Sequence, residues 1–167
     1  MDSDEIGLDV IVHDAGDGRS IPLGDGGTVT MKLEGIHTNQ TLAVYEFTVP
    51  SRTAGPPQHI HATWDEAFYV LSGVMTFLLD VHERQVTVGG FVFVPHGVPH
   101  TFWNEGDAPA TNLTIFAPSG IEQYFDAVTG ALAAGVANEE IHGLFAQHEM
   151  TVVDDGRAAY GALNRDG

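Results

Sequence analysis

The sequence GPPQHIHATWDE, at residues 55–66, places two histidines two positions apart and a glutamate five positions after the second. Residues i and i+2 of a β-strand project from the same face, so His59 and His61 can offer both imidazoles to one ion. Five positions of regular strand would put Glu66 on the opposite face. Its carboxylate can therefore join the histidines only if residues 62–65 bend the chain, and the sequence ATWD is compatible with such a bend.

A second stretch, GGFVFVPHGVPHTFWN at residues 89–104, predicts a strand, a tight Pro-His-Gly turn and a returning strand. The returning strand would begin at His100 and carry this imidazole beside the first hairpin. The chain has no cysteine, which excludes disulfides and thiolate catalysis. A metal bound here would therefore take His, Asp or Glu side chains as its ligands.

Short β-strands separated by turns rich in Gly and Pro account for the first two-thirds of the chain. The runs are rich in Val, Ile, Thr, Phe and Tyr, and many alternate apolar with polar residues. This succession is typical of an all-β sandwich or barrel. We expect strands at residues 28–33, 41–49, 67–71, 74–81, 85–88, 91–94, 100–104 and 110–116.

After Pro118 the apolar periodicity becomes helical. Ser119 and Glu122 have the spacing of a capping box, apolar residues follow at helical intervals, and Gly135 is expected to end this helix. Asn138 is expected to cap a second helix. A last short strand is expected at residues 151–153.

The chain carries 23 acidic and 6 basic side chains, a formal net charge of −17. Nucleic acids and anionic membrane surfaces would repel such a protein, so we expect neither as a partner. No apolar run approaches the roughly 20 residues that cross a bilayer. The first residues, MDSDE, lack the basic and then apolar order of a secretory signal, and we therefore expect a cytoplasmic protein.

The two stretches resemble the two sequence motifs of the cupin superfamily. The first motif is a glycine, His-x-His, four residues, Glu, six residues and Gly; the second is Gly, five residues, Pro-x-Gly, two residues, His, three residues and Asn. The positions that match are, in chain order, His59, His61, Glu66, Gly73, Gly89, Pro95, Gly97, His100 and Asn104. One position departs, because three residues instead of five separate Gly55 from His59.

The resemblance implies a double-stranded β-helix, the jelly-roll barrel of the cupins, over residues 20–117. A flexible acidic N-terminal arm at residues 1–19 would precede it. A C-terminal segment of helices and tail, residues 118–167, would pack on the barrel or on a partner subunit. Single-barrel cupins often form dimers, so the resemblance is compatible with a homodimer.

The resemblance also implies one metal ion, with His59, His61, Glu66 and His100 as its ligands. Three imidazoles and one carboxylate suit a divalent first-row ion, iron, nickel, manganese, copper or zinc, better than calcium or magnesium. Four protein ligands leave one or two positions open on an octahedral ion, as a catalytic site needs. Asp65 is one position off the ligand pattern and is expected to be solvated, as is an outward-pointing His96.

Aromatic residues close to these positions have two interpretations, the lining of a cavity for an apolar or aromatic substrate or plain barrel core. The candidates for the substrate pocket are Phe68, Phe102, Tyr45, Phe47, Phe93 and Phe116. Basic residues are scarce in the predicted strands, which disfavours substrates that carry phosphate groups.

The stretch APSGIEQYF, at residues 117–125, is similar to small bacterial quercetinase-like dioxygenases. This resemblance implies a metal-dependent oxidoreductase that uses O₂ to open a ring or cleave a carbon–carbon bond in a hydroxylated aromatic or enol-type small molecule. Glu66 would be its catalytic residue, as a ligand or as the general base for the substrate hydroxyl. Two alternatives remain open: a redox-neutral isomerase, cyclase or lyase, and a non-catalytic small-molecule-binding cupin.

Overall fold

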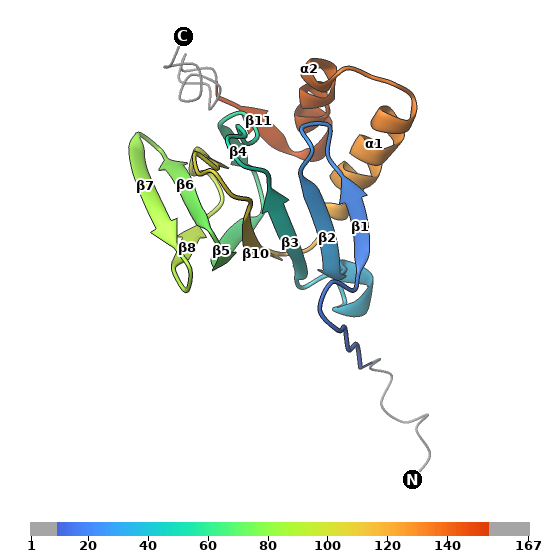
Figure 1. Ribbon diagram of the computed structural model, residues 1–167. Coiled ribbons are helices and arrows are strands. Elements are labelled where there is room, and N and C mark those ends of the chain that lie inside the picture. The colour runs from blue at the N-terminus through green and yellow to red at the C-terminus, as the bar shows by residue number, and fades with distance from the viewer. Residues whose placement is uncertain (1–9, 154–167) are drawn as a thin grey trace.

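The computed structural model describes residues 10–153 and contains two antiparallel β-sheets (Figure 1). The six-stranded sheet has the order β1-β2-β3-β10-β5-β8, and the five-stranded sheet has the order β11-β4-β9-β6-β7. Several neighbours, such as β3 and β10 or β4 and β9, are far apart in sequence, as in a jelly roll. The predicted fold class, an all-β double-stranded barrel with a short C-terminal helical segment, is confirmed.

The six-stranded sheet is built from strands that alternate apolar with polar residues. Both β3 and β10 follow a strict alternation of inward and outward side chains, with Tyr45 and Phe47 of β3 and Phe116 of β10 among the buried residues. The bounds are β1 Arg19–Pro22, β2 Thr28–Leu33, β3 Ala43–Val49, β5 Asp65–Ser72, β8 Phe91–Val94 and β10 Ala110–Ala117. Strand β1 was not predicted, because RSIP shows no alternation and contains a proline.

The five-stranded sheet carries both histidine segments. Its bounds are β4 His59–His61, β6 Val74–Leu79, β7 His82–Thr87, β9 His100–Trp103 and β11 Met150–Val152. The sheet crosses the predicted domain boundary at residue 117, since β11 comes from the C-terminal segment and pairs with β4. The predicted arm and tail include residues 1–9 and 154–167, which lie outside the described residues.

The helical segment lies at one end of the barrel, where it contacts β1 and β11 (Figure 1). It consists of α1 Glu122–Ala133, α2 Asn138–Ile141 and the 3₁₀ helix η3 His142–His148; a further 3₁₀ turn, η2, covers Gly35–His37. Gly135 has a φ of +74° and follows the end of α1, as predicted. The structure does not describe the side chain of Asn138, the expected second cap. No helix within residues 10–153 is long and apolar enough to cross a membrane.

The predicted capping box at the start of α1 is wrong. The residue that caps the helix is Ile121, without a side-chain hydrogen bond. The Ser119 hydroxyl instead donates to Gln40, and the Glu122 carboxylate accepts from the backbone N–H groups of Gly120 and Gly35. Glu122 therefore ties the start of the helix to η2, the turn that joins β2 and β3, because a distant backbone donor competes with the local cap.

Asn104, the last residue of the second motif, joins the end of β3 to the loop between β9 and β10. Its buried side-chain amide donates to the carbonyls of Val49, Pro50 and Ala108 at 2.9–3.1 Å, and its oxygen accepts from the N–H of Gly106 at 2.9 Å. These contacts give Asn104 a structural role in the motif.

Replacing Asn104→Ala should lower the free energy of unfolding by about 2–4 kcal/mol, because several buried backbone groups lose their partner. Urea denaturation followed by circular dichroism measures the change. Gln85→Ala removes an exposed amide on β7 and should change the free energy by less than about 0.5 kcal/mol. Equal effects of the two substitutions would contradict the structural role of Asn104.

Candidate metal centre

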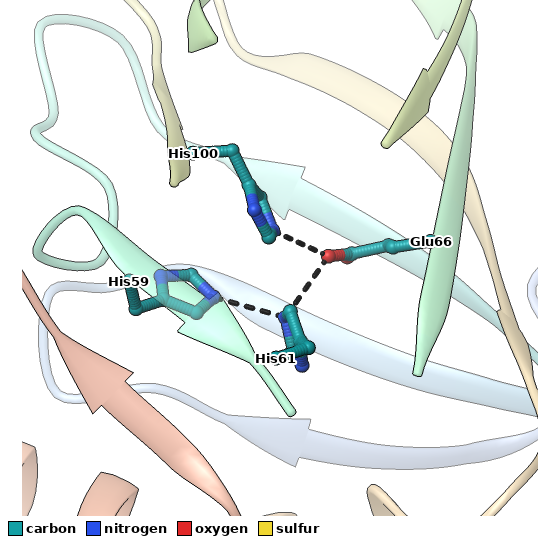
Figure 2. A group of neighbouring side chains, drawn as sticks. All are labelled: His59, His61, Glu66 and His100. Carbon is teal, nitrogen blue, oxygen red and sulfur yellow. Dashed lines mark hydrogen bonds and ion pairs between the residues drawn. The ribbon is translucent and has the colours of Figure 1, made fainter. Parts of the chain in front are cut away.

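Four buried side chains from three strands point toward a common centre (Figure 2). His59 and His61 come from β4, Glu66 from β5 and His100 from β9. One nitrogen or oxygen atom of each side chain lies within 4.8 Å of those of the other three. The two motifs are therefore brought together in space as the sequence predicted.

The bend that the sequence required before Glu66 is present. Strand β4 ends at His61 and β5 begins at Asp65, and the residues between them leave the strand conformation. Trp64 is buried in this bend, with its ring 5.5 Å from the ring of His61. The backbone N–H of Ala62 and the hydroxyl of Thr63 both donate to Glu149, which precedes β11. The C-terminal segment therefore holds the bend in place.

The turn between β8 and β9 is fixed by Asp65. One carboxylate oxygen of Asp65 accepts from the backbone N–H of His96 at 2.9 Å and lies 2.7 Å from Nδ1 of its ring. The N–H of Gly97 donates to the carbonyl of His61 at 2.9 Å. Both Asp65 and His96 are partly exposed and point away from the cluster. Asp65 thus positions the turn that leads into His100 and is no member of the cluster.

Two backbone carbonyls set the orientation of the outer imidazoles. Nδ1 of His59 lies 2.8 Å from the oxygen of Pro57, and Nδ1 of His100 lies 2.9 Å from the oxygen of Val98. A carbonyl oxygen only accepts, so both Nδ1 atoms carry a proton. The Nε2 atoms of both rings face the centre, that of His59 with a lone pair and that of His100 toward the Glu66 carboxylate. Nδ1 of His61 is buried and has no hydrogen-bond partner among the described residues.

The three short contacts at the centre need more protons than the four side chains can place there. Nε2 of His61 lies 3.1 Å from Nε2 of His59 and 3.2 Å from a Glu66 oxygen, and Nε2 of His100 lies 2.9 Å from the same oxygen. With its proton on Nδ1, His59 offers only a lone pair here. A cation at the centre would satisfy all four atoms at once. The donor set therefore fits a metal ion.

Burial and neighbouring charges shift the pKa values of these groups in different directions. Burial raises the pKa of Glu66, but hydrogen bonds from His100 and His61 outweigh it and bring the value to about 2. Burial, together with the neighbouring His100 and His61, lowers the pKa of His59 well below its usual value. Burial also opposes the charged form of His100, but the hydrogen bond to Glu66 raises its pKa overall. The cluster thus contains an ionised carboxylate and a neutral His59.

Three imidazole nitrogens and one carboxylate oxygen could hold a divalent transition ion. This donor set is found with iron, nickel, manganese, copper and zinc, whereas calcium and magnesium prefer oxygen ligands.

The family model described as the cupin domain matches residues 45–116. This segment runs from β3 to β10 and contains both histidine segments. Residues 45–116 form a cupin domain.

Solved structures with the same fold support this assignment. The chain is similar to the polyketide cyclase RemF from Streptomyces resistomycificus, with a TM-score of 0.58, 21% identity and coverage of 66% of this chain and 80% of that one. It is also similar to an RmlC-like cupin from Shewanella frigidimarina, with a TM-score of 0.57, 19% identity and coverage of 66% and 93%. For KdgF from Halomonas sp. the TM-score is 0.56 and the identity 17%, with coverage of 63% of this chain and 90% of that one. No curated protein sequence matches the chain.

A cavity of about 140 Å³ leads from the metal centre to the surface of the cupin domain. His59, His61 and Glu66 line it, together with the predicted pocket residues Phe47, Phe102 and Phe116. Gly55 also lines it, and a Cβ at this position would lie 1.6 Å from the carbonyl oxygen of Phe102. Only glycine allows the two backbones to approach so closely, which accounts for Gly55 in spite of its altered spacing.

The other three candidate pocket residues do not line this cavity. Tyr45 and Phe68 are fully buried in the barrel core, where the Phe68 ring packs against those of Phe77 and Phe102. The prediction that Phe93 lines the pocket is wrong. Its side chain is 56% exposed, because the alternation of β8 turns Val92 and Val94 inward.

Sequence reasoning missed the residues that close the cavity from the C-terminal side. Tyr124, Phe125 and Val128 of α1, and Phe145 of η3, all line it. The ring of Phe145 also packs 5.0 Å from that of His59. The helical periodicity of residues 121–132 marked an apolar face, but nothing local to the sequence indicated that this face covers the metal centre.

Replacing His61→Ala or His100→Ala should remove most of the bound metal. Loss of a direct ligand should weaken affinity by more than the ~10–100-fold that loss of an outer-shell partner costs. Elemental analysis of purified protein measures the metal content. His82→Ala, which removes an exposed histidine on β7, should leave it unchanged. Full metal content in both cluster variants, folded by circular dichroism, would overturn the ligand assignment.

Acidification should weaken metal binding through His100. Its pKa is raised, so a metal ion must displace a proton from this imidazole below that pKa, whereas Glu66, with a pKa of about 2, is already ionised. The affinity for Zn²⁺ or Ni²⁺ should fall by up to about tenfold per pH unit for each proton displaced. Calorimetric titrations of metal-free protein, in buffers of different ionisation enthalpy, count the protons. A pH-independent affinity without proton release would contradict this expectation.

Proposed function

We propose that the protein is a metal-dependent dioxygenase that acts on a hydroxylated aromatic or enol-type small molecule. One observation carries this proposal: three histidines and a glutamate converge beside an apolar cavity that three of them line together with six aromatic side chains. Such a cavity binds apolar molecules and brings them to the metal centre.

The side chains of the cluster would hold the ion throughout the reaction. His59, His61 and His100 would contribute Nε2, and Glu66 would contribute a carboxylate oxygen. When bound, the ion supplies Lewis acidity toward a substrate hydroxyl and, with iron, nickel, manganese or copper, the capacity to mediate reaction with O₂. The aromatic walls would exclude water and orient the substrate ring toward this end of the cavity.

Glu66 has two candidate roles, ligand and general base. A carboxylate with a pKa of about 2 is a weak base, and both His61 and His100 bond to it, so the metal-free arrangement supports the ligand role. The described residues that line the cavity include two carboxylates, Glu66 and Asp25. Glu66 belongs to the cluster, whereas Asp25 lies at the exposed mouth. Any proton taken from the substrate hydroxyl by a protein carboxylate would pass to Glu66.

Redox-neutral chemistry is the second candidate. The same four donors would hold a zinc ion as a Lewis acid for an isomerase, cyclase or lyase, without any need for O₂. A non-catalytic cupin would use the cavity for binding alone. Dependence of turnover on O₂ separates the dioxygenase from the redox-neutral enzyme, and the absence of any turnover marks the non-catalytic function.

Turnover of a hydroxylated benzene or an enolisable 1,3-diketone should stop when O₂ is removed. An oxygen electrode measures uptake with protein loaded in turn with Fe²⁺, Ni²⁺, Mn²⁺, Cu²⁺ and Zn²⁺. Glu66→Gln should lower kcat/KM by about 10²–10⁴-fold, whereas Glu83→Gln, an exposed change on β7, should not alter it.

Anaerobic conversion of the same compounds would replace the dioxygenase proposal with the redox-neutral one. Tight binding without conversion in either atmosphere would leave only the non-catalytic function.

A further inference from the structure

We infer that the cavity selects an uncharged substrate of about one aromatic ring in size. The inference concerns the site of the proposed function and rests on that function for the statement that its occupant is a substrate. It narrows the broad class of hydroxylated aromatic and enol-type molecules by two properties of the cavity, its volume and its charge.

The volume sets the size limit. The cavity has about 140 Å³, and an engineered apolar cavity of about 150 Å³ holds one benzene molecule. Pockets for drug-sized ligands have volumes of about 300–1,000 Å³. A flavonol, with three rings, exceeds this volume, and only one of its rings would fit between the metal centre and the surrounding side chains.

Interlocked rings keep this volume small. The Phe47 ring lies 5.8 Å from that of Phe102 and 5.7 Å from that of Phe125. On the other side, Phe145 packs 5.0 Å from His59 and 5.2 Å from Tyr124. Each wall residue thus touches the barrel, the metal centre or a second wall residue, so a larger guest would have to displace several packed rings.

The charges of the cavity disfavour anions. Its lining contains the acids Glu66 and Asp25 and no lysine or arginine. The four cations in the described part of the chain bond elsewhere: Arg19 to Glu34 and Asp126, Lys32 to Glu46, Arg52 to Asp107 and Arg84 to a backbone carbonyl.

A bound divalent ion beside Glu66 would be the one positive charge in the described cavity, at its inner end. An anionic group anywhere else in the cavity would lose its hydration without gaining a cationic side chain. The net charge of −17 would also lower the concentration of anions near the mouth. A neutral ring with one hydroxyl or carbonyl oxygen therefore fits the walls and the metal centre better than a phosphate or sulfonate does.

Val128 offers a matched pair of variants at one position. It is buried on α1 and lines the cavity. Val128→Phe should fill the space and Val128→Ala should enlarge it, while Val88→Phe adds the same ring at an exposed position after β7.

Calorimetry on the metal-loaded protein would compare four probes: phenol, benzenesulfonate, 2-naphthol and quercetin. We expect the Kd of phenol to be at least about tenfold lower than that of benzenesulfonate, and we expect quercetin not to bind. The Val128→Phe variant should no longer bind phenol, and the Val128→Ala variant should bind 2-naphthol more tightly than the parent protein does. The Val88→Phe variant should behave like the parent protein.

Three results would overturn the inference: no binding of phenol, equal affinity for benzenesulfonate, or binding of quercetin as tight as that of phenol. Circular dichroism checks that each variant is folded, and Val128→Ala keeps the size test valid if Val128→Phe does not fold. Binding is measured without turnover, so the two proposals fail separately. A protein that binds phenol but converts nothing would overturn only the dioxygenase proposal, whereas oxygen-dependent cleavage of a flavonol would overturn only the size limit.

Discussion

The pairing of β4 with β9, in which His59 lies opposite His100, is the contact on which the metal centre depends. It brings together two segments that are separated in sequence by the four strands β5 to β8. Strand β4 has only three residues, and β9 and β11 hold it from opposite sides. Once His59 is fixed, the alternation of the strand also fixes His61. Glu66 then reaches the same centre from the other sheet, so the cluster also depends on how the two sheets pack.

This centre is costly to bury without an ion. Its four polar side chains are each at most 5% exposed, and burial opposes the charged form of Glu66 and of His100. The pKa of His59 falls while that of His100 rises, although their rings lie 4.7 Å apart. Apolar side chains of similar volume would satisfy the barrel core with less desolvation. The arrangement makes physical sense as a binding site, where local rules of packing are commonly broken.

Strand alternation predicted that His59 and His61 share a face, and the resemblance to the cupin motifs implied Glu66 and His100 as their partners. A bend before Glu66 was the condition for its carboxylate to join them, because a regular strand would turn it to the opposite face. Long-range contacts limited what else could be predicted. Phe93 was misplaced because the inward face of β8 depends on its register with β5, in which Glu66 lies opposite Val94. The capping box failed for a related reason: Glu122 bonds the N–H of Gly35, a partner that no local pattern reveals.

The C-terminal segment links the closure of the cavity to the stability of the metal centre. Strand β11 pairs with β4 across His59 and His61, and Glu149 accepts bonds from the bend that follows them. Phe145, from the same segment, packs on the His59 ring. Lifting this segment to admit a substrate would therefore disturb two of the four donors. The turn between β1 and β2, where Gly24 and Asp25 are exposed, also lines the cavity, and substrate entry beside this turn would leave β4 and the metal centre intact.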